Sequence, residues 1–247
     1  EKRIKKNSSI LLSLLISTNY IMSNKVVALL PMKGHSERVP NKNLKLFYGK
    51  PLYHSILNQI LLTKTIEMIV VDTDSIAIKD DINKEFNDIT IIDRPKEIQG
   101  DLVSMNKIIS HDLSIIKGEH FLQTHSTNPL ITAKTIDNAV NQYLSDLENY
   151  DSLFSVNELK TRLYDKNMQP INHNPRELIR TQDLEPLYEE NSNFYIFSKS
   201  SFKNAKNERI GINPNYFEIT KLEAIDIDTE EDFIIAEAIK ERLDYET

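Results

Sequence analysis

The chain contains no cysteine, which excludes disulfide bonds, thiolate metal sites and a cysteine nucleophile. It has only five glycines and lacks the Walker A, G-x-G-x-x-G, G-x-S-x-G and H-E-x-x-H patterns. An excess of basic residues is also missing, because 37 acidic and 30 basic side chains give a net charge of -7. A nucleic-acid-binding surface is therefore not expected. A protein of the cytoplasm, with no membrane partner, is the default expectation for a cysteine-free chain of this composition.

The first 21 residues differ in character from the rest of the chain. Basic residues precede the apolar run Ile10–Ile16, as they do in a signal peptide, but no small-residue cleavage pattern follows. The run is too short to cross a bilayer as a helix. Met22 stands where an initiator methionine would precede the first strand. We therefore expect residues 1–21 to be an extension outside the fold, from an over-long start, with an export signal as the alternative. The folded domain is then expected to span residues 22–247.

Short apolar runs and amphipathic helical patterns alternate along this domain. Strands are predicted at residues 26–30, 68–71, 89–92, 120–123, 151–156, 193–197, 216–219 and 224–227. Helices are predicted from Pro51, over 74–86, from about Val103, and over 132–144 and 229–243. Such alternation indicates an α/β fold with a mainly parallel sheet covered on both faces. Residues 157–190 are polar and aperiodic, so they are expected to form an excursion from this single domain.

A basic loop, Pro31–Asn43, follows the first predicted strand. Gly34 lets the backbone approach a ligand closely, and Lys33, Arg38 and Lys42 supply positive charge that offsets phosphate. Ligands of such sheets bind beyond the carboxyl ends of the strands, which is where this loop lies. The loop is thus either a cradle for an anionic ligand or a solvated basic turn.

The segment "IDIDTEED" carries a pair of carboxylates near the C-terminus. In a strand, Asp226 and Asp228 point to the same face, where together they can bind Mg²⁺. The alternative is that Asp228 only caps the last helix. Thr229 and Asp232 match a capping box at the start of that helix.

Two further polar segments contain candidate residues. "DRPKEIQGDLVS" places Arg94 before Asp101 and Ser104, and the simpler interpretation is an arginine paired with a nearby carboxylate. "HSTNPL" follows a predicted strand and carries His125, which either faces the cleft or is a structural histidine.

Together, these segments resemble the acylneuraminate cytidylyltransferases, the enzymes that make CMP-activated sialic acids and related sugar acids. The family's opening loop is matched in register by Pro31, Ser36, Pro40, Lys42 and Asn43, with Lys33 at the family's arginine. Further matches, in order, are Asp72–Asp74, then Arg94, Pro95, Glu97 and Asp101, then "HSTNPL", then "NSNFYIF" from Asn191, and finally Asp226, Asp228 and Asp232. The resemblance runs from about Val26 to Leu243.

This resemblance implies a three-layer, Rossmann-like nucleotidyltransferase fold, and CMP transfer from CTP to a keto acid sugar with release of pyrophosphate. The implied catalytic residues are Lys33, Lys42 and Asp228. The implied nucleotide-binding residues are Lys33, Gly34, Ser36, Arg38, Lys42, Asn43, Arg94 and Ser104. The implied sugar-binding residues are His125, Arg180, Gln182 and Asn191, and Asp226 and Asp228 are the implied Mg²⁺ ligands. The excursion at about 157–190 resembles the family's dimerisation arm, which reaches the neighbouring subunit's site, so a homodimer is implied.

The sequence departs from the family pattern at four positions. Glu37 replaces a loop lysine, Lys33 an arginine and His125 a glutamine, while Ile131 stands where arginine is common. A lysine acts as a point charge and lacks the planar fork of arginine. Two alternatives are a nucleotidyltransferase of the same fold that acts on a sugar or alcohol phosphate, and a catalytically silent nucleotide-binding homologue.

Overall fold

The computed structural model describes residues 25–36, 38–177 and 179–245. The predictions about residues 1–21 and Glu37 therefore lie outside the described residues. Within the described part, no helix is both long and apolar enough to cross a membrane.

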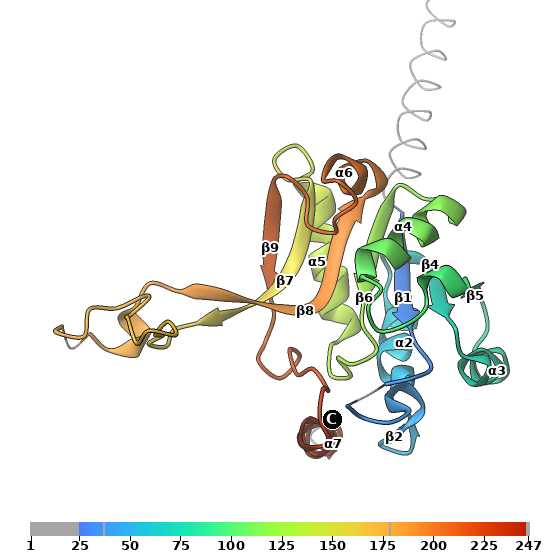
Figure 1. Ribbon diagram of the computed structural model, residues 1–247, viewed down its shortest axis with the longest axis horizontal. Helices are drawn as coiled ribbons and strands as arrows, with labels where there is room; N and C mark the ends of the chain where they lie inside the picture. Colours follow the sequence, from blue (N-terminus) through green and yellow to red (C-terminus); the bar gives the residue numbers. More distant parts are fainter. Residues whose placement is uncertain (1–24, 37, 178, 246–247) are drawn as a thin grey trace, which may run out of the picture.

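The described strands form one large sheet and one small hairpin (Figure 1). Their bounds are β1 Val26–Met32, β2 Leu46–Phe47, β3 Lys50–Pro51, β4 Ile66–Thr73, β5 Ile89–Asp93, β6 His120–Thr124, β7 Ser152–Leu159, β8 Leu187–Ser198 and β9 Pro214–Glu218. The large sheet has the order β5-β4-β1-β6-β8-β7-β9, and β2 pairs with β3. β5, β4, β1 and β6 run parallel, β8 is antiparallel to both of its neighbours, and β9 is parallel to β7. The prediction of a mainly parallel sheet is confirmed.

All the α-helices of the described part except α7 lie against one face or the other of this sheet (Figure 1). Their bounds are α2 Tyr53–Leu62, α3 Ile76–Glu85, α4 Met105–Ile115, α5 Ala133–Ser145, α6 Lys199–Asn204 and α7 Glu230–Tyr245, with short 3₁₀ turns η1 Lys42–Leu44, η2 Lys96–Ile98 and η3 Thr181–Asp183. Pro51 lies in β3, so α2 begins two residues later than the sequence pattern placed it.

The alternation of side chains along β1 explains the three layers. Val26 and Ala28 pack with α2, α3 and α5 on one face. Val27 and Leu29 pack with α4 and α6 on the other face. A strand buried on both faces needs apolar side chains at every position, which is what the run "VVALL" supplies.

A third cluster lies where α7 meets the β2–β3 hairpin, and it includes Phe47, Ile227 and Phe233. The strand predicted over residues 224–227 is wrong, because this segment pairs with no strand. It crosses the end of the sheet, and its Ile227 N–H donates to the Thr127 carbonyl at 2.9 Å. Burial of Ile227 against α7 anchors this segment, which is not part of any sheet.

β7 and β8 continue past the body of the protein as a long two-stranded arm with an irregular tip (Figure 1). We call residues 157–190 the arm. β7 and β8 pair at its base, and residues 160–186 lie beyond the paired strands. The arm exposes several large apolar side chains, namely Tyr164, Met168, Ile171, Ile179 and Tyr188.

Candidate active site

A cavity of about 410 Å³ opens at the carboxyl ends of β1 and β6. It collects Lys33, Ser36, Arg38, Lys42, Asn43, Arg94 and His125 from loops that are far apart in the sequence. All but one of the residues implied for nucleotide binding in the basic loop therefore face one space. The exception is Gly34, which does not line the cavity.

Hydrogen bonds hold the basic loop in place. The Asn43 side chain donates to the Lys33 carbonyl at 2.8 Å and accepts from Ser126 Oγ at 2.6 Å. Because Ser126 follows β6, Asn43 ties the loop after β1 to the loop after β6. Lys33 forms an ion pair with Asp101, which lies in the loop before α4. Lys33 and Asn43 are thus held at the cavity wall by contacts with the loop before α4 and the loop after β6.

Gly34 has a structural reason to be glycine. A Cβ atom at this position would lie 2.8 Å from the Cβ of Ser75. The Gly34 N–H donates to Asp74 Oδ1 at 2.7 Å. The close contact of Gly34 in the structure is thus with the loop after β4, while the expected approach to a ligand remains a prediction.

The two carboxylates of "IDID" adjoin the cations of the loop. Asp228 Oδ1 lies 2.7 Å from Arg38 Nη2 and 3.4 Å from Lys42 Nζ, and Lys42 Nζ also donates to the Ile227 carbonyl at 2.5 Å. Burial, followed by the nearby charge of Asp228, raises the pKa of Asp226. The last helix is capped by Thr229 and Asp232, whose side chains each accept from the other's N–H, so Asp228 is free of the capping role.

This pair offers the oxygen ligands that Mg²⁺ prefers. Asp226 Oδ1 is buried without a hydrogen-bond partner, and such an atom is costly unless something supplies positive charge. The residues present therefore fit a divalent cation.

Arg94 is buried and pairs with Asp72 at the end of β4. Its Nε donates to Asp72 Oδ1, and its Nη2 donates to the Asp72 carbonyl at 3.1 Å. The simpler prediction, an arginine paired with a carboxylate, is confirmed. Arg94 nevertheless lines the cavity as well, so the ion pair fixes a guanidinium group at the cavity wall.

His125 is positioned by two residues behind it. Arg209 Nη1 donates to Gln123 Oε1 at 2.7 Å, and the Gln123 amide nitrogen lies 3.2 Å from His125 Nε2. Since the amide oxygen of Gln123 faces arginine, its NH₂ group faces the imidazole. His125 Nε2 is then an acceptor, and the proton of a neutral ring is on Nδ1. Burial and the cations Arg209 and Lys42 lower the pKa of His125 to about 4, so this neutral form prevails at neutral pH.

Besides Gly34 and the acidic pair, which adjoins the cavity, four further implied residues do not line the cavity of their own chain. Ser104 caps α4 and accepts from the Lys107 N–H at 3.3 Å. Asn191 lies at the base of the arm and donates to Asn157 Oδ1 at 3.0 Å. Arg180 and Gln182 lie on the arm, where Arg180 Nε is 2.7 Å from Asp183 Oδ2. Their implied roles remain predictions.

Sequence reasoning missed Asp112, Gln123 and Arg209. Asp112 carried a usable signal, because it falls four residues after Ile108 on the apolar face of α4, where a carboxylate is unexpected. Arg209 had no such signal. It lies in the irregular segment between α6 and β9 and meets Gln123 only through the tertiary fold.

The fold and the cavity define a three-layer α/β protein with a cation-lined site at the carboxyl ends of parallel strands, next to an acidic pair. The cytidylyltransferase family model matches residues 27–246. This chain belongs to that family.

Several characterised relatives are similar to the chain. It is 31% identical to the N-acylneuraminate cytidylyltransferase of Escherichia coli O18:K1:H7 over 55% of this chain and 32% of that protein. It is 26% identical to that of Streptococcus agalactiae serotype III over 85% and 52%, respectively. The pseudaminic acid cytidylyltransferase of Campylobacter jejuni serotype O:2 is 22% identical over 70% and 78%. The chain thus spans about half or less of the length of the N-acylneuraminate enzymes named here.

A solved structure shares the fold. CMP:2-keto-3-deoxy-manno-octonic acid synthetase complexed with CTP superposes with a TM-score of 0.67, at 13% identity, over 88% of this chain and 99% of that one. The predicted fold class is confirmed.

Proposed function

We propose that this protein transfers CMP from CTP to the anomeric hydroxyl of a nonulosonic acid and releases pyrophosphate. The observation that carries the proposal is the single cavity formed by Lys33, Arg38, Lys42 and Arg94 beside an acidic pair, in a chain of the cytidylyltransferase family. The acceptor class is supported by the relatives named for N-acylneuraminate and pseudaminic acid.

In the proposed reaction, the acceptor hydroxyl oxygen forms a bond to the α-phosphorus of CTP. The bond from that phosphorus to the bridging oxygen breaks, the hydroxyl loses its proton, and pyrophosphate leaves. Such transfers depend on positioning and on stabilisation of charge. Lys33, Arg38 and Lys42 bind the triphosphate and stabilise the leaving pyrophosphate. Lys33 and Arg38 each exchange a carboxylate partner for a phosphate, since both are paired in the free chain.

Asp226 and Asp228 would hold Mg²⁺. When bound, the ion supplies charge stabilisation for the phosphates. The buried Asp226 oxygen without a partner supports this assignment.

His125 acts toward the acceptor as a hydrogen-bond donor. Because Nε2 accepts from Gln123, the ring presents N–H at Nδ1 and has no free lone pair for a base. A donor suits a carboxylate or hydroxyl oxygen of a sugar acid. This differs from the family's glutamine, which carries both a donor and an acceptor.

We also propose that the protein is a homodimer in which the arm of one subunit reaches the cavity of the other. The arm projects from the body and exposes Tyr164, Met168 and Ile171, which is costly for a free surface (Figure 1). Arg180 and Gln182, on the arm, would then contact the sugar in the partner's site.

The proposal is tested by incubating the protein with each nucleoside triphosphate, Mg²⁺ and a panel of acceptors while pyrophosphate is followed. The panel contains an N-acylneuraminate, pseudaminic acid, 2-keto-3-deoxy-manno-octonic acid and a sugar phosphate. We expect turnover only with CTP and a keto acid sugar.

Asp228→Asn should lower the rate on the order of 10²-fold or more, because the metal supplies several kcal/mol of stabilisation. Asp80→Asn, on the exposed side of α3, is the matched control. Turnover with the sugar phosphate alone, or CTP binding without any turnover, contradicts the proposal.

A further inference from the structure

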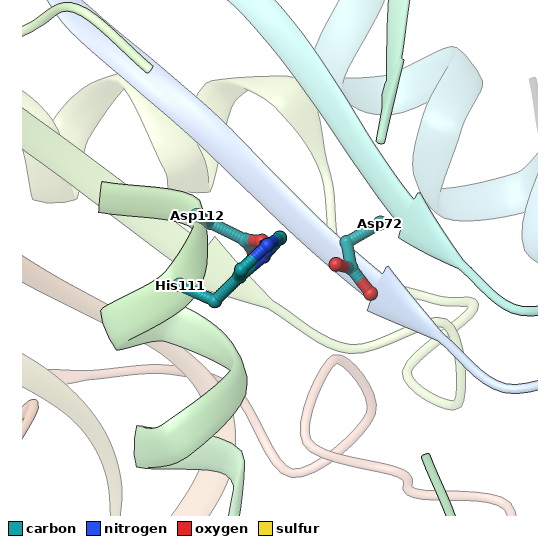
Figure 2. A group of neighbouring side chains, drawn as sticks. All are labelled: Asp72, His111 and Asp112. Carbon is teal, nitrogen blue, oxygen red and sulfur yellow. The ribbon is translucent and has the colours of Figure 1, made fainter. Parts of the chain in front are cut away.

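A second acidic group lies behind Arg94, outside the cavity. Figure 2 shows His111 and Asp112 reaching from α4 toward Asp72 at the end of β4. One ligand-type atom from each of the three lies within 4.8 Å of the others. Arg94 Nε donates to Oδ1 of the same Asp72 carboxylate.

The two carboxyl groups are buried and incompletely bonded. The side chains of Asp72 and Asp112 are each 1% exposed. The Oδ2 atom of each has no hydrogen-bond partner. A buried carboxylate oxygen without a donor costs more than most other features of a folded protein. Because the two oxygens belong to side chains that lie close together in space, we expect one feature to account for both.

A cation or a proton can resolve this arrangement. Two ionised carboxylates and one guanidinium leave one excess negative charge in a buried place. A divalent cation carries two positive charges, which is one more than this excess requires. It would also lie close to Arg94, which repels it. One proton cancels the excess charge and converts one of the two oxygens without a partner into a donor for the other. The charge balance therefore favours a proton, and a proton on a carboxyl group, unlike one on the neighbouring His111, also gives the two Oδ2 atoms a hydrogen bond.

We propose that Asp112 is a neutral carboxylic acid hydrogen-bonded to Asp72, and that this pair positions Arg94 at the nucleotide cavity. Asp112 does not line the nucleotide cavity, so it is a positioning residue that acts through Asp72 and Arg94.

The surroundings of Asp112 support this state. Burial, then the charge of Asp72 and a hydrogen bond to it, raise the pKa of Asp112 to about 9, and Arg94 opposes the shift. The charged or titratable groups facing it are Asp72 from β4, Arg94 from the loop after β5, and His111 from its own helix. β1, which also packs against α4, brings only apolar side chains.

The pair matters for nucleotide binding. With Asp112 neutral, Arg94 and Asp72 form a balanced ion pair whose guanidinium faces the cavity. Ionisation of Asp112 adds a negative charge behind Arg94, opposes a triphosphate, and breaks the bond that orients Asp72. CTP affinity should therefore fall as Asp112 ionises, on the order of tenfold for one added charge at this range. Only this consequence rests on the proposed function.

The protonation state is measured directly by carbon-13 NMR of aspartate side-chain carboxyl carbons across a pH titration. We expect one carboxyl that remains protonated at neutral pH and titrates near pH 9, and that is missing from Asp112→Asn. A spectrum in which every aspartate of the parent is ionised at neutral pH overturns the proposal. This readout needs neither CTP nor turnover, so its failure is separate from failure of the proposed function.

The positioning role is measured by calorimetry of CTP binding from neutral pH to above pH 9. Asp112→Asn keeps a hydrogen-bond donor to Asp72 but cannot ionise. Its CTP affinity at neutral pH should therefore stay near the parent's. The fall in its CTP affinity between neutral pH and above pH 9 should be about tenfold smaller than the parent's. Asp112→Leu removes the donor and should bind CTP weakly at every pH. Asp80→Asn, an exposed change of the same kind, should follow the parent. Equal pH profiles for the parent and Asp112→Asn overturn the role.

The cation alternative has its own measurement. Equilibrium dialysis with Zn²⁺ or Mn²⁺ should give the same stoichiometry for the parent and for Asp112→Asn. One bound ion that is lost only in Asp112→Asn would overturn the shared proton.

Discussion

At the scale of single residues, several side chains of the site are each held in place by a hydrogen bond to a second residue. Asn43 fixes the basic loop through Ser126, Asp72 holds Arg94, and Gln123 holds His125. Each link leaves the outer residue with one orientation. A site prepared in this way binds a charged ligand without reordering long side chains, which lowers the entropic cost of binding.

Replacing Arg209 with Met should raise the pKa of His125 from about 4 toward its ordinary value. The change removes a nearby cation and also frees the Gln123 amide to rotate, so the Nδ1–H tautomer should lose its preference. NMR titration of the imidazole nitrogens measures both effects.

In the parent, the unfolded chain binds more protons than the folded chain between about pH 4 and 6.5, so stability should rise with pH across that window. Arg209→Met should show a smaller rise of stability with pH across the same window.

Lys203→Met, which removes an exposed positive charge from α6, is the matched control and should leave the His125 titration unchanged. An unchanged titration in Arg209→Met would show that Arg209 does not set the state of this ring.

At the scale of elements, the ends of strands and helices carry the chemistry. β1, β5 and β6 each deliver a loop to the cavity from their carboxyl ends. The segment before α7 brings Asp226 and Asp228 to the same place, anchored by Ile227 in the α7 cluster. Loops make suitable sites here because the sheet behind them is rigid and buried.

Thr229→Ala should destabilise the protein by about 1 kcal/mol, because it removes the side-chain oxygen that accepts from the Asp232 N–H at the start of α7. Thr229→Ser keeps that oxygen and should stay close to the parent. Urea unfolding monitored by circular dichroism measures both variants. If alanine and serine had equal midpoints, the capping box would contribute nothing to the fold.

At the scale of the whole molecule, the protein has a body that contains the cavity and an arm that extends away from it (Figure 1). Residues implied for sugar binding are divided between the two parts. His125 lines the cavity, while Arg180 and Gln182 lie on the arm. A second subunit brings both sets to one site in the proposed homodimer.

Two inactive variants should therefore complement each other. Arg180→Ala impairs the arm and Asp228→Asn impairs the cavity, so a mixed dimer contains one cavity and one arm that are both intact. Co-refolding equal amounts should restore about a quarter of parental turnover, because half of the dimers are mixed and each has one working site. Sedimentation velocity confirms the dimer in the same samples. Activity that stays at the level of the separate variants would mean that the arm does not act across subunits.

Local sequence pattern was enough to predict the alternating elements, the parallel sheet and two segments that line or adjoin the cavity. These features rest on local periodicity and on residue types at short spacing, as in "VVALL", the basic loop and "IDID". The contacts that the side chains make depend on long-range packing and could not be predicted from the sequence. The predicted strand at 224–227 became an unpaired segment because it crosses the sheet end, and Gly34 approaches Ser75 in the loop after β4. Asp112, Gln123 and Arg209 gained their roles through contacts between elements that are distant along the chain. Burial and charge at such contacts depend on long-range packing, which local pattern does not encode.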